Sequence, residues 1–156
     1  IEEKADKEVL ERLKAHYAAV KWGIGAHKSP KDYGSFPFDA YSHTPAMAGV
    51  QQPGMTGQVK EDLLNRFFEL GIRVNNGKLS IATDMLNKDE FVDNTLCFTY
   101  CAVPFVYVLG TRKGIDVEYC NGTTSSFANN EIDQATSAAI FARTKDIKQI
   151  IVHLSL

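Results

Sequence analysis

The sequence contains neither a long hydrophobic run nor an excess of basic residues. No apolar stretch approaches the ~18 residues that a membrane-spanning helix needs. A formal net charge of −2 provides no positive field for a phosphate backbone. The 156 residues, 44% of them hydrophobic, suffice for one ordinary domain or two small ones with a buried core. We therefore expect a globular protein with neither a membrane nor a nucleic acid as its partner.

Cysteine is scarce as well, and histidine offers no metal-binding spacing. The three cysteines, Cys97, Cys101 and Cys120, lie in apolar, strand-like segments. A free cysteine commonly behaves as a small buried hydrophobe, so we expect all three to be buried. Cys97 and Cys101 are joined by strand-like residues rather than by a metal knuckle, and no two histidines have ligand spacing. No phosphate-binding loop or dinucleotide fingerprint occurs either, so we expect neither a metal nor another cofactor.

Signals for the cellular compartment are missing too. The chain begins Ile1-Glu2-Glu3, without an initiator methionine or a signal-like apolar segment. We therefore expect a piece of a longer protein. Asn121-Gly122-Thr123 matches the acceptor sequence for N-glycosylation, but Asn-Gly after an apolar strand is first of all a tight-turn signal. The sequence leaves the localisation unknown.

The first part of the chain has the pattern of two amphipathic helices separated by a long loop. Apolar residues at helical spacing predict one helix over residues 2–22 and a second over residues 58–70. Gly71 supplies the stop of the second helix. Four of the five prolines, at positions 30, 37, 45 and 53, fall between the helices and prevent a regular element from running far.

After Gly71 the hydrophobic period changes from helical to two, which is typical of strands. The Asn75-Asn76-Gly77 turn predicts a hairpin between strands over residues 72–74 and 78–81. Further strands are expected over 95–100, 105–109, 115–120, about 138–143, and 147–154. The expected class is α+β: two N-terminal helices and a long loop over residues 1–71, then a mainly antiparallel, β-sandwich-like domain over residues 72–156.

Three short segments carry a resemblance to a known group of enzymes. They are Gly54-Met55-Thr56-Gly57, Leu70-Gly71-Ile72-Arg73-Val74, and Gly77-Lys78-Leu79-Ser80-Ile81, followed by a connection over residues 85–91. Their order resembles the C-terminal end of (α/α)6-barrel carbohydrate-active enzymes of the cellobiose-phosphorylase-like kind, in the six-hairpin glycosidase superfamily. The resemblance implies a Gly/Thr-rich loop that leads into a late barrel helix, then a hairpin and a closing β-sheet.

This chain departs from the family pattern in two respects. Gln51-Gln52-Pro53-Gly54-Met55 stands where the phosphorylases have an aromatic-rich loop with tryptophan beside the Thr-Gly step. The general acid that the resemblance implies would lie upstream of every residue in the chain.

The loop over residues 33–57 is where we expect sugar contacts. A helix N-terminus with flanking glycines can approach an anion or a sugar hydroxyl closely. Glutamine amides suit sugar hydroxyls, and a histidine can carry a proton. Aromatic rings in this loop can stack on a sugar or pin the loop to the core, and the threonine hydroxyl can cap the helix instead. The predicted substrate-binding residues are Tyr41, His43, Gln51, Gln52, Gly54 and Thr56, with His43 also the candidate for catalysis.

We therefore expect a C-terminal fragment of a glycoside hydrolase or phosphorylase-like enzyme, inactive by itself and partnered by a carbohydrate and the rest of its parent chain. The alternative is an autonomous carbohydrate-binding or protein-interaction module without catalysis, and a third possibility is a structural cap. Glu61 and Asp62 do not form a glycosidase pair, because neighbouring residues on a helix point in different directions. Barrel helices without their neighbours should expose an apolar patch, through which the chain would self-associate. That patch separates the fragment interpretation from the other two.

Overall fold

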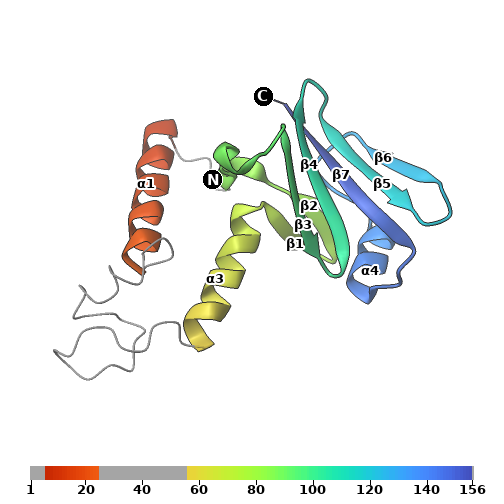
Figure 1. The fold of residues 1–156 in the computed structure, drawn as a ribbon, viewed down its shortest axis with the longest axis horizontal. Coiled ribbons are helices and arrows are strands. Elements are labelled where there is room, and N and C mark those ends of the chain that lie inside the picture. The colour runs from red at the N-terminus through yellow and green to blue at the C-terminus, as the bar shows by residue number, and fades with distance from the viewer. Residues whose placement is uncertain (1–5, 25–55, 156) are drawn as a thin grey trace. The chain divides into compact units, whose positions relative to one another are not determined.

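A computed structural model describes residues 6–24 and 56–155 of the chain. The chain divides into two compact units, residues 1–67 and 68–156 (Figure 1). Helix α1 spans Lys7–Ile24, and helix α3 spans Thr56–Glu69. Among the described residues, no helix is both long enough and apolar enough to cross a membrane.

Helix α3 ends at a glycine that leads directly into a two-stranded sheet. Gly71 has a φ of +82°, and its amide donates to the Phe68 carbonyl at 3.0 Å. Strands β1 (Ile72–Asn75) and β2 (Lys78–Ile81) then pair in antiparallel fashion, as the sequence predicts for this hairpin. Asn76 and Gly77 both have positive φ, which is the type I′ turn that suits the twist of a two-residue hairpin.

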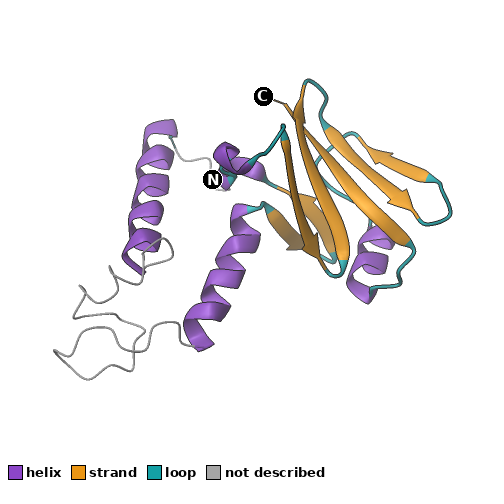
Figure 2. Ribbon diagram, viewed as in Figure 1, coloured by secondary structure: helices purple, strands orange, loops and turns teal. Residues whose placement is uncertain are grey.

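A second sheet contains five strands in the order β3-β4-β7-β5-β6 (Figures 1 and 2). Strands β4 and β7 are parallel, and the other three pairs are antiparallel. The strands are β3 (Thr95–Tyr100), β4 (Val103–Gly110), β5 (Gly114–Tyr119), β6 (Thr124–Phe127) and β7 (Ile147–Ser155), with 3-10 turns η1 (Thr83–Met85) and η2 (Lys88–Glu90) before them. The described elements therefore make an α+β protein.

The strand that we predict over residues 138–143 is wrong, because this segment belongs to helix α4 (Gln134–Ala142). Asp133 caps the helix by accepting a hydrogen bond from the Thr136 amide at 2.8 Å. Arg143 ends it in the left-handed conformation, with a φ of +54°. A short apolar run does not distinguish a strand from a buried helix, and the aspartate cap was the signal that decides.

The core lies on one face of the five-stranded sheet. The register places Phe105 opposite Ile150 and Ile150 opposite Val117, so these side chains share a face, and all three are fully buried. Opposed residues on the same face form the packing unit of a sheet. The other buried members from the sheet, the hairpin and α4 are Val103, Tyr107, Ile115, Ile147, Val152, Ile72, Leu79, Ile81 and Ile140.

Two buried hydrogen bonds join elements within this unit, one between the five-stranded sheet and the turn before β1, and one between the hairpin and α4. The fully buried Tyr107 hydroxyl donates to the Leu70 carbonyl at 2.6 Å, and burial raises the pKa of the tyrosine. The Ser137 hydroxyl of α4 accepts from the Leu79 amide at 3.0 Å. Buried polar groups need such partners, because losing one leaves an unsatisfied group at a cost of about 1–3 kcal/mol.

The cysteines do not all follow the expected burial. Cys97 and Cys120 are exposed and Cys101 is partly buried, so the prediction of three buried cysteines is wrong for the first two. Cys97 alternates with Leu96 and Phe98 of β3, whose opposed residues Tyr107 and Phe105 are in the core. Strand alternation therefore turns Cys97 to the other face. Cys120 lies in the turn that follows β5 rather than inside the strand.

Candidate functional site

The sugar-site residues predicted from the sequence fall almost entirely outside the described residues. This is true of Tyr41, His43, Gln51, Gln52 and Gly54. Thr56 is the first residue of α3, two positions before the helix start that the sequence predicts, and its side chain is outside the described part. Their role in sugar binding stays a prediction.

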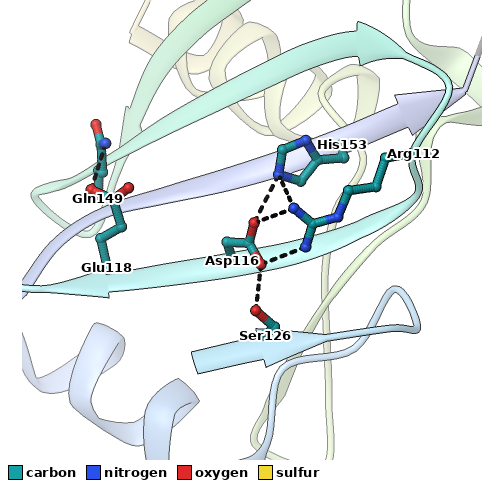
Figure 3. Close-up of polar contacts among 6 residues, drawn as sticks. All are labelled: Arg112, Asp116, Glu118, Ser126, Gln149 and His153. Atoms are coloured by element: carbon teal, nitrogen blue, oxygen red, sulfur yellow. Dashed lines mark hydrogen bonds and ion pairs between the residues drawn. The ribbon is translucent and has the colours of Figure 1, made fainter. Parts of the chain in front are cut away.

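The described residues contain a different polar cluster, on the face of the five-stranded sheet that is opposite the core (Figure 3). We call it the Asp116 cluster, and it consists of Arg112, Asp116, Ser126 and His153. Asp116 lies on β5 between the buried residues Ile115 and Val117, so alternation points its carboxylate away from the core. Ser126 is directly opposite Asp116 on β6, and His153 comes from β7 on the other side.

The geometry of the cluster is a carboxylate surrounded by donors. Arg112 donates from both terminal nitrogens, Nη1 to Oδ2 and Nη2 to Oδ1 of Asp116, each at 2.8 Å. The Ser126 hydroxyl donates to Oδ1 at 2.6 Å, and Nε2 of His153 is 2.9 Å from Oδ2. The Asp116 side chain is only 14% exposed, whereas the Arg112 side chain is 56% exposed, so water reaches the arginine side of the Arg112–Asp116 ion pair.

These contacts determine the charge of Asp116. Partial desolvation pushes the pKa of the carboxyl upward, but hydrogen bonds from Arg112, Ser126 and His153 outweigh it and lower the pKa to about 2. A carboxylate stabilised this strongly is ionised throughout the neutral range. It is therefore a poor proton donor or acceptor, because a catalytic acid or base needs a pKa near the working pH.

The order of the residues also excludes a nucleophilic triad. In a serine hydrolase the histidine lies between the serine and the aspartate and takes the proton of the serine. Here the aspartate lies in the middle, because the Ser126 hydroxyl donates to Asp116 itself. Within residues 6–24 and 56–155, no three acidic, histidine or cysteine side chains gather as metal ligands.

The arrangement fits a cross-strand clamp that fastens β5 to β6 and β7. A second contact continues it along the same two central strands, where the Gln149 amide of β7 donates to Glu118 of β5 at 2.8 Å (Figure 3). Lys148 also lies 3.5 Å from the Glu118 carboxylate. Hydrogen-bonded and oppositely charged cross-strand pairs of this kind stabilise the pairing of neighbouring strands.

Sequence reasoning placed His153 in a late strand but did not find the cluster. The usable signal was the alternation in Ile115-Asp116-Val117-Glu118, which marks two acidic residues on the non-core face of a strand. The partners of Asp116 come from strands far along the chain, so no local pattern reveals them. No protein-family model and no curated protein matches this chain.

Proposed function

We propose that this chain is the C-terminal part of a glycoside hydrolase or phosphorylase-like enzyme built on an (α/α)6 barrel. In this proposal α1 and α3 are barrel helices, and the unit over residues 68–156 is a sandwich-like domain that closes the barrel. The loop over residues 33–57 contributes to the sugar site. The observation that carries the proposal is the exposure of apolar side chains on both helices.

The exposed apolar residues recur at helical spacing rather than singly. On α1, Val9 and Leu13 lie four residues apart and are 45% and 58% exposed. On α3, Leu64 and Phe68 have the same spacing and are 68% and 41% exposed, next to the exposed Leu63. Residues four apart share one face of a helix. Burying apolar area is worth about 25 cal/mol per Å2, so a helix that exposes such a stripe gains stability from a partner surface.

The junction after α3 supports the same proposal. The helix passes through Gly71 directly into the β1–β2 hairpin, in the order that the resemblance implies. The guanidinium of Arg73 lies 3.9 Å from the ring centroid of Phe68, and its Nη1 also donates to the Phe68 carbonyl at 3.3 Å. These contacts hold the Phe68 side chain and carbonyl against the first strand of the hairpin.

The five-stranded sheet offers little support for the autonomous sugar-binding alternative. A sugar ring needs an exposed aromatic face on which to stack. In β3 and β4 the aromatic rings pack on one another on the core face: Phe98 lies 5.2 Å from Phe105 and 5.1 Å from Tyr107, centroid to centroid. On the opposite face, the strand residues that surround the Asp116 cluster are aliphatic or polar. This favours a structural role for the sheet, with the sugar contacts made elsewhere in the parent.

We expect the purified chain to self-associate through the exposed helix stripes. Replacing Leu63 and Leu64 together by lysine should reduce the association, because two charges would then have to be desolvated in the contact. Val92→Lys is the matched control, since Val92 is 74% exposed but lies outside the helices. Sedimentation velocity over a range of concentrations measures the effect. A wild-type chain that stays monomeric at high concentration contradicts the proposal, and so does equal loss of association in both variants.

In the complete product of the natural gene, His43→Ala and Gln52→Ala should each lower kcat/KM for a disaccharide substrate. A lost hydrogen bond of about 0.5–1.5 kcal/mol corresponds to a roughly two- to tenfold decrease. The measurement is sugar release with and without phosphate, across the pH range around the ordinary pKa of histidine, with thermal unfolding as the check on stability. Wild-type kinetics in both variants would contradict the sugar-site role of the loop and favour a purely structural role. Glycan binding by the 156-residue chain alone would favour the autonomous module instead.

A further inference from the structure

The chain contains two Asn-Gly pairs, and the structure holds them in different states. Asn76-Gly77 forms the β1–β2 turn, and Asn121-Gly122 lies in the turn between β5 and β6. Both asparagines are exposed. Asn-Gly is chemically unstable in general, because glycine has no side chain to hinder attack of its amide nitrogen on the preceding side-chain amide. The fold can slow that attack by holding either reacting group.

At Asn121 the fold holds both groups. The side-chain oxygen Oδ1 accepts from the Thr123 amide at 2.9 Å and from the Thr123 hydroxyl at 2.7 Å. The attacking group is occupied as well, because the Gly122 amide donates to the Tyr119 carbonyl at 3.0 Å. Two hydrogen bonds of the Asn121 side chain and one of the Gly122 amide must therefore break before the Gly122 nitrogen can reach Cγ of Asn121.

At Asn76 neither group is held within the described part of the chain. The one hydrogen bond there is to the backbone carbonyl of Asn76, from the Gln134 side chain at 3.5 Å, and it does not restrain the side-chain amide. The Gly77 amide has no hydrogen-bond partner among the described residues, as expected for the second loop residue of a two-residue hairpin. Both reacting groups are therefore available.

We propose that Asn76 is a site of spontaneous deamidation in the folded protein and that Asn121 is protected from it. The Gly77 nitrogen attacks Cγ of Asn76 and loses its proton to solvent base. The bond from Cγ to Nδ2 breaks, ammonia leaves, and a cyclic succinimide forms. Water then opens the ring at either carbonyl and yields aspartate or isoaspartate. No oxidant, reductant or enzyme takes part.

The two products have different consequences for the hairpin. Aspartate tolerates the left-handed conformation that Asn76 adopts, with a φ of +49°. Isoaspartate adds a backbone methylene to a two-residue loop whose length sets the strand register. The neighbouring strand β2 contains the buried Leu79, whose amide donates to Ser137 of α4. Isoaspartate at position 76 should therefore loosen the attachment of β2 to α4. This inference is independent of the proposed function.

Peptide mapping of the purified 156-residue chain after prolonged incubation in mildly alkaline buffer tests the inference. The peptide that contains Asn76 should accumulate the acid forms at least several-fold faster than the peptide that contains Asn121. In urea, where the fold is lost, the two sites should react at similar rates. Equal rates in the folded chain, faster reaction at Asn121, or no reaction at Asn76 while the unfolded chain reacts would each overturn the inference.

A variant tests the protective contacts directly. Thr123→Val keeps the β-branched shape but removes the hydroxyl that donates to Asn121. In the folded chain it should raise the rate at Asn121 and leave the rate at Asn76 unchanged. No rise at Asn121, with thermal unfolding showing an intact fold, would overturn the protection that we assign to this side chain.

Discussion

Replacing Gly71 by alanine should destabilise the unit over residues 68–156 by about 2–4 kcal/mol. Gly71 has a φ of +82°, and a Cβ there would lie 2.4 Å from the Ala82 carbonyl oxygen and 2.8 Å from its carbon. Both atoms belong to the backbone, so no flexible side chain can move aside. The Ala82 amide also donates to the Gly71 carbonyl at 2.8 Å, and the substitution would force this contact apart.

The expected loss at Gly71 has two causes, the positive φ and the close contact of a Cβ with the Ala82 backbone. Two other glycines allow the two causes to be measured separately. Gly122 has a φ of +87° but no atom within 4 Å of a Cβ, so Gly122→Ala should cost only the conformational term of about 1 kcal/mol. Gly110 has neither a positive φ nor a close neighbour, so Gly110→Ala should be almost neutral. Urea unfolding measures all three. A cost at Gly71 no greater than that at Gly122 would show that Ala82 is not the obstacle.

Loss of the Asp116 carboxylate should remove an acid-dependent part of the stability. The carboxyl has a folded-state pKa of about 2 against an ordinary value of 3.8. Because the pKa is lowered on folding, the stabilisation is complete above pH 3.8 and is lost as the pH falls toward about 2. The difference in pKa sets an upper limit of roughly 2 kcal/mol. Because the Arg112 side chain is 56% exposed and water screens the ion pair, Asp116→Asn should cost about 1 kcal/mol near neutral pH and progressively less in acid.

The comparison of acid unfolding curves isolates this residue from the other carboxylates. Wild type and Asp116→Asn should converge in stability below the ordinary aspartate pKa. Ser126→Ala removes one hydrogen-bond donor to Asp116, at 2.6 Å from Oδ1. This variant should therefore lose less stability on acidification than wild type and more than Asp116→Asn. Parallel curves for wild type and Asp116→Asn at all pH values would mean that the ionised Asp116 carboxylate contributes no acid-dependent stability.

The parts of the fold that could be predicted from the sequence are those with a local signal. Strand β3 over Thr95–Tyr100 has the predicted bounds, and the β1–β2 hairpin follows from the Asn-Gly turn. Strand β6 was missed because Thr124–Phe127 is short and three of its four residues are polar. This strand is stabilised by its pairing with β5, which places Phe127 opposite Ile115, and not by a strand pattern in its own sequence. Helix α4 was mistaken for a strand because its apolar run was weighed without its cap.

The partners of Asp116 in the polar cluster could not be predicted from the sequence either. Alternation along β5 predicts that Asp116 faces away from the core, and nothing in the neighbouring residues says what it meets there. Its partners Ser126 and His153 depend on strand register across two different pairings. Register is a property of the assembled sheet, so only the structure could bring these three residues together.

The position of β7 in the sheet constrains the time at which this domain can fold during synthesis. β7 is the last of the five strands along the chain, yet it lies between β4 and β5 and pairs with both. Until residues 147–155 have left the ribosome, the β3–β4 and β5–β6 hairpins have no common partner, and a two-stranded hairpin alone is barely stable in water. The sheet therefore closes only after translation of this domain is complete, and until then the inner strands β4 and β5 each expose an unpaired edge that chaperones can recognise.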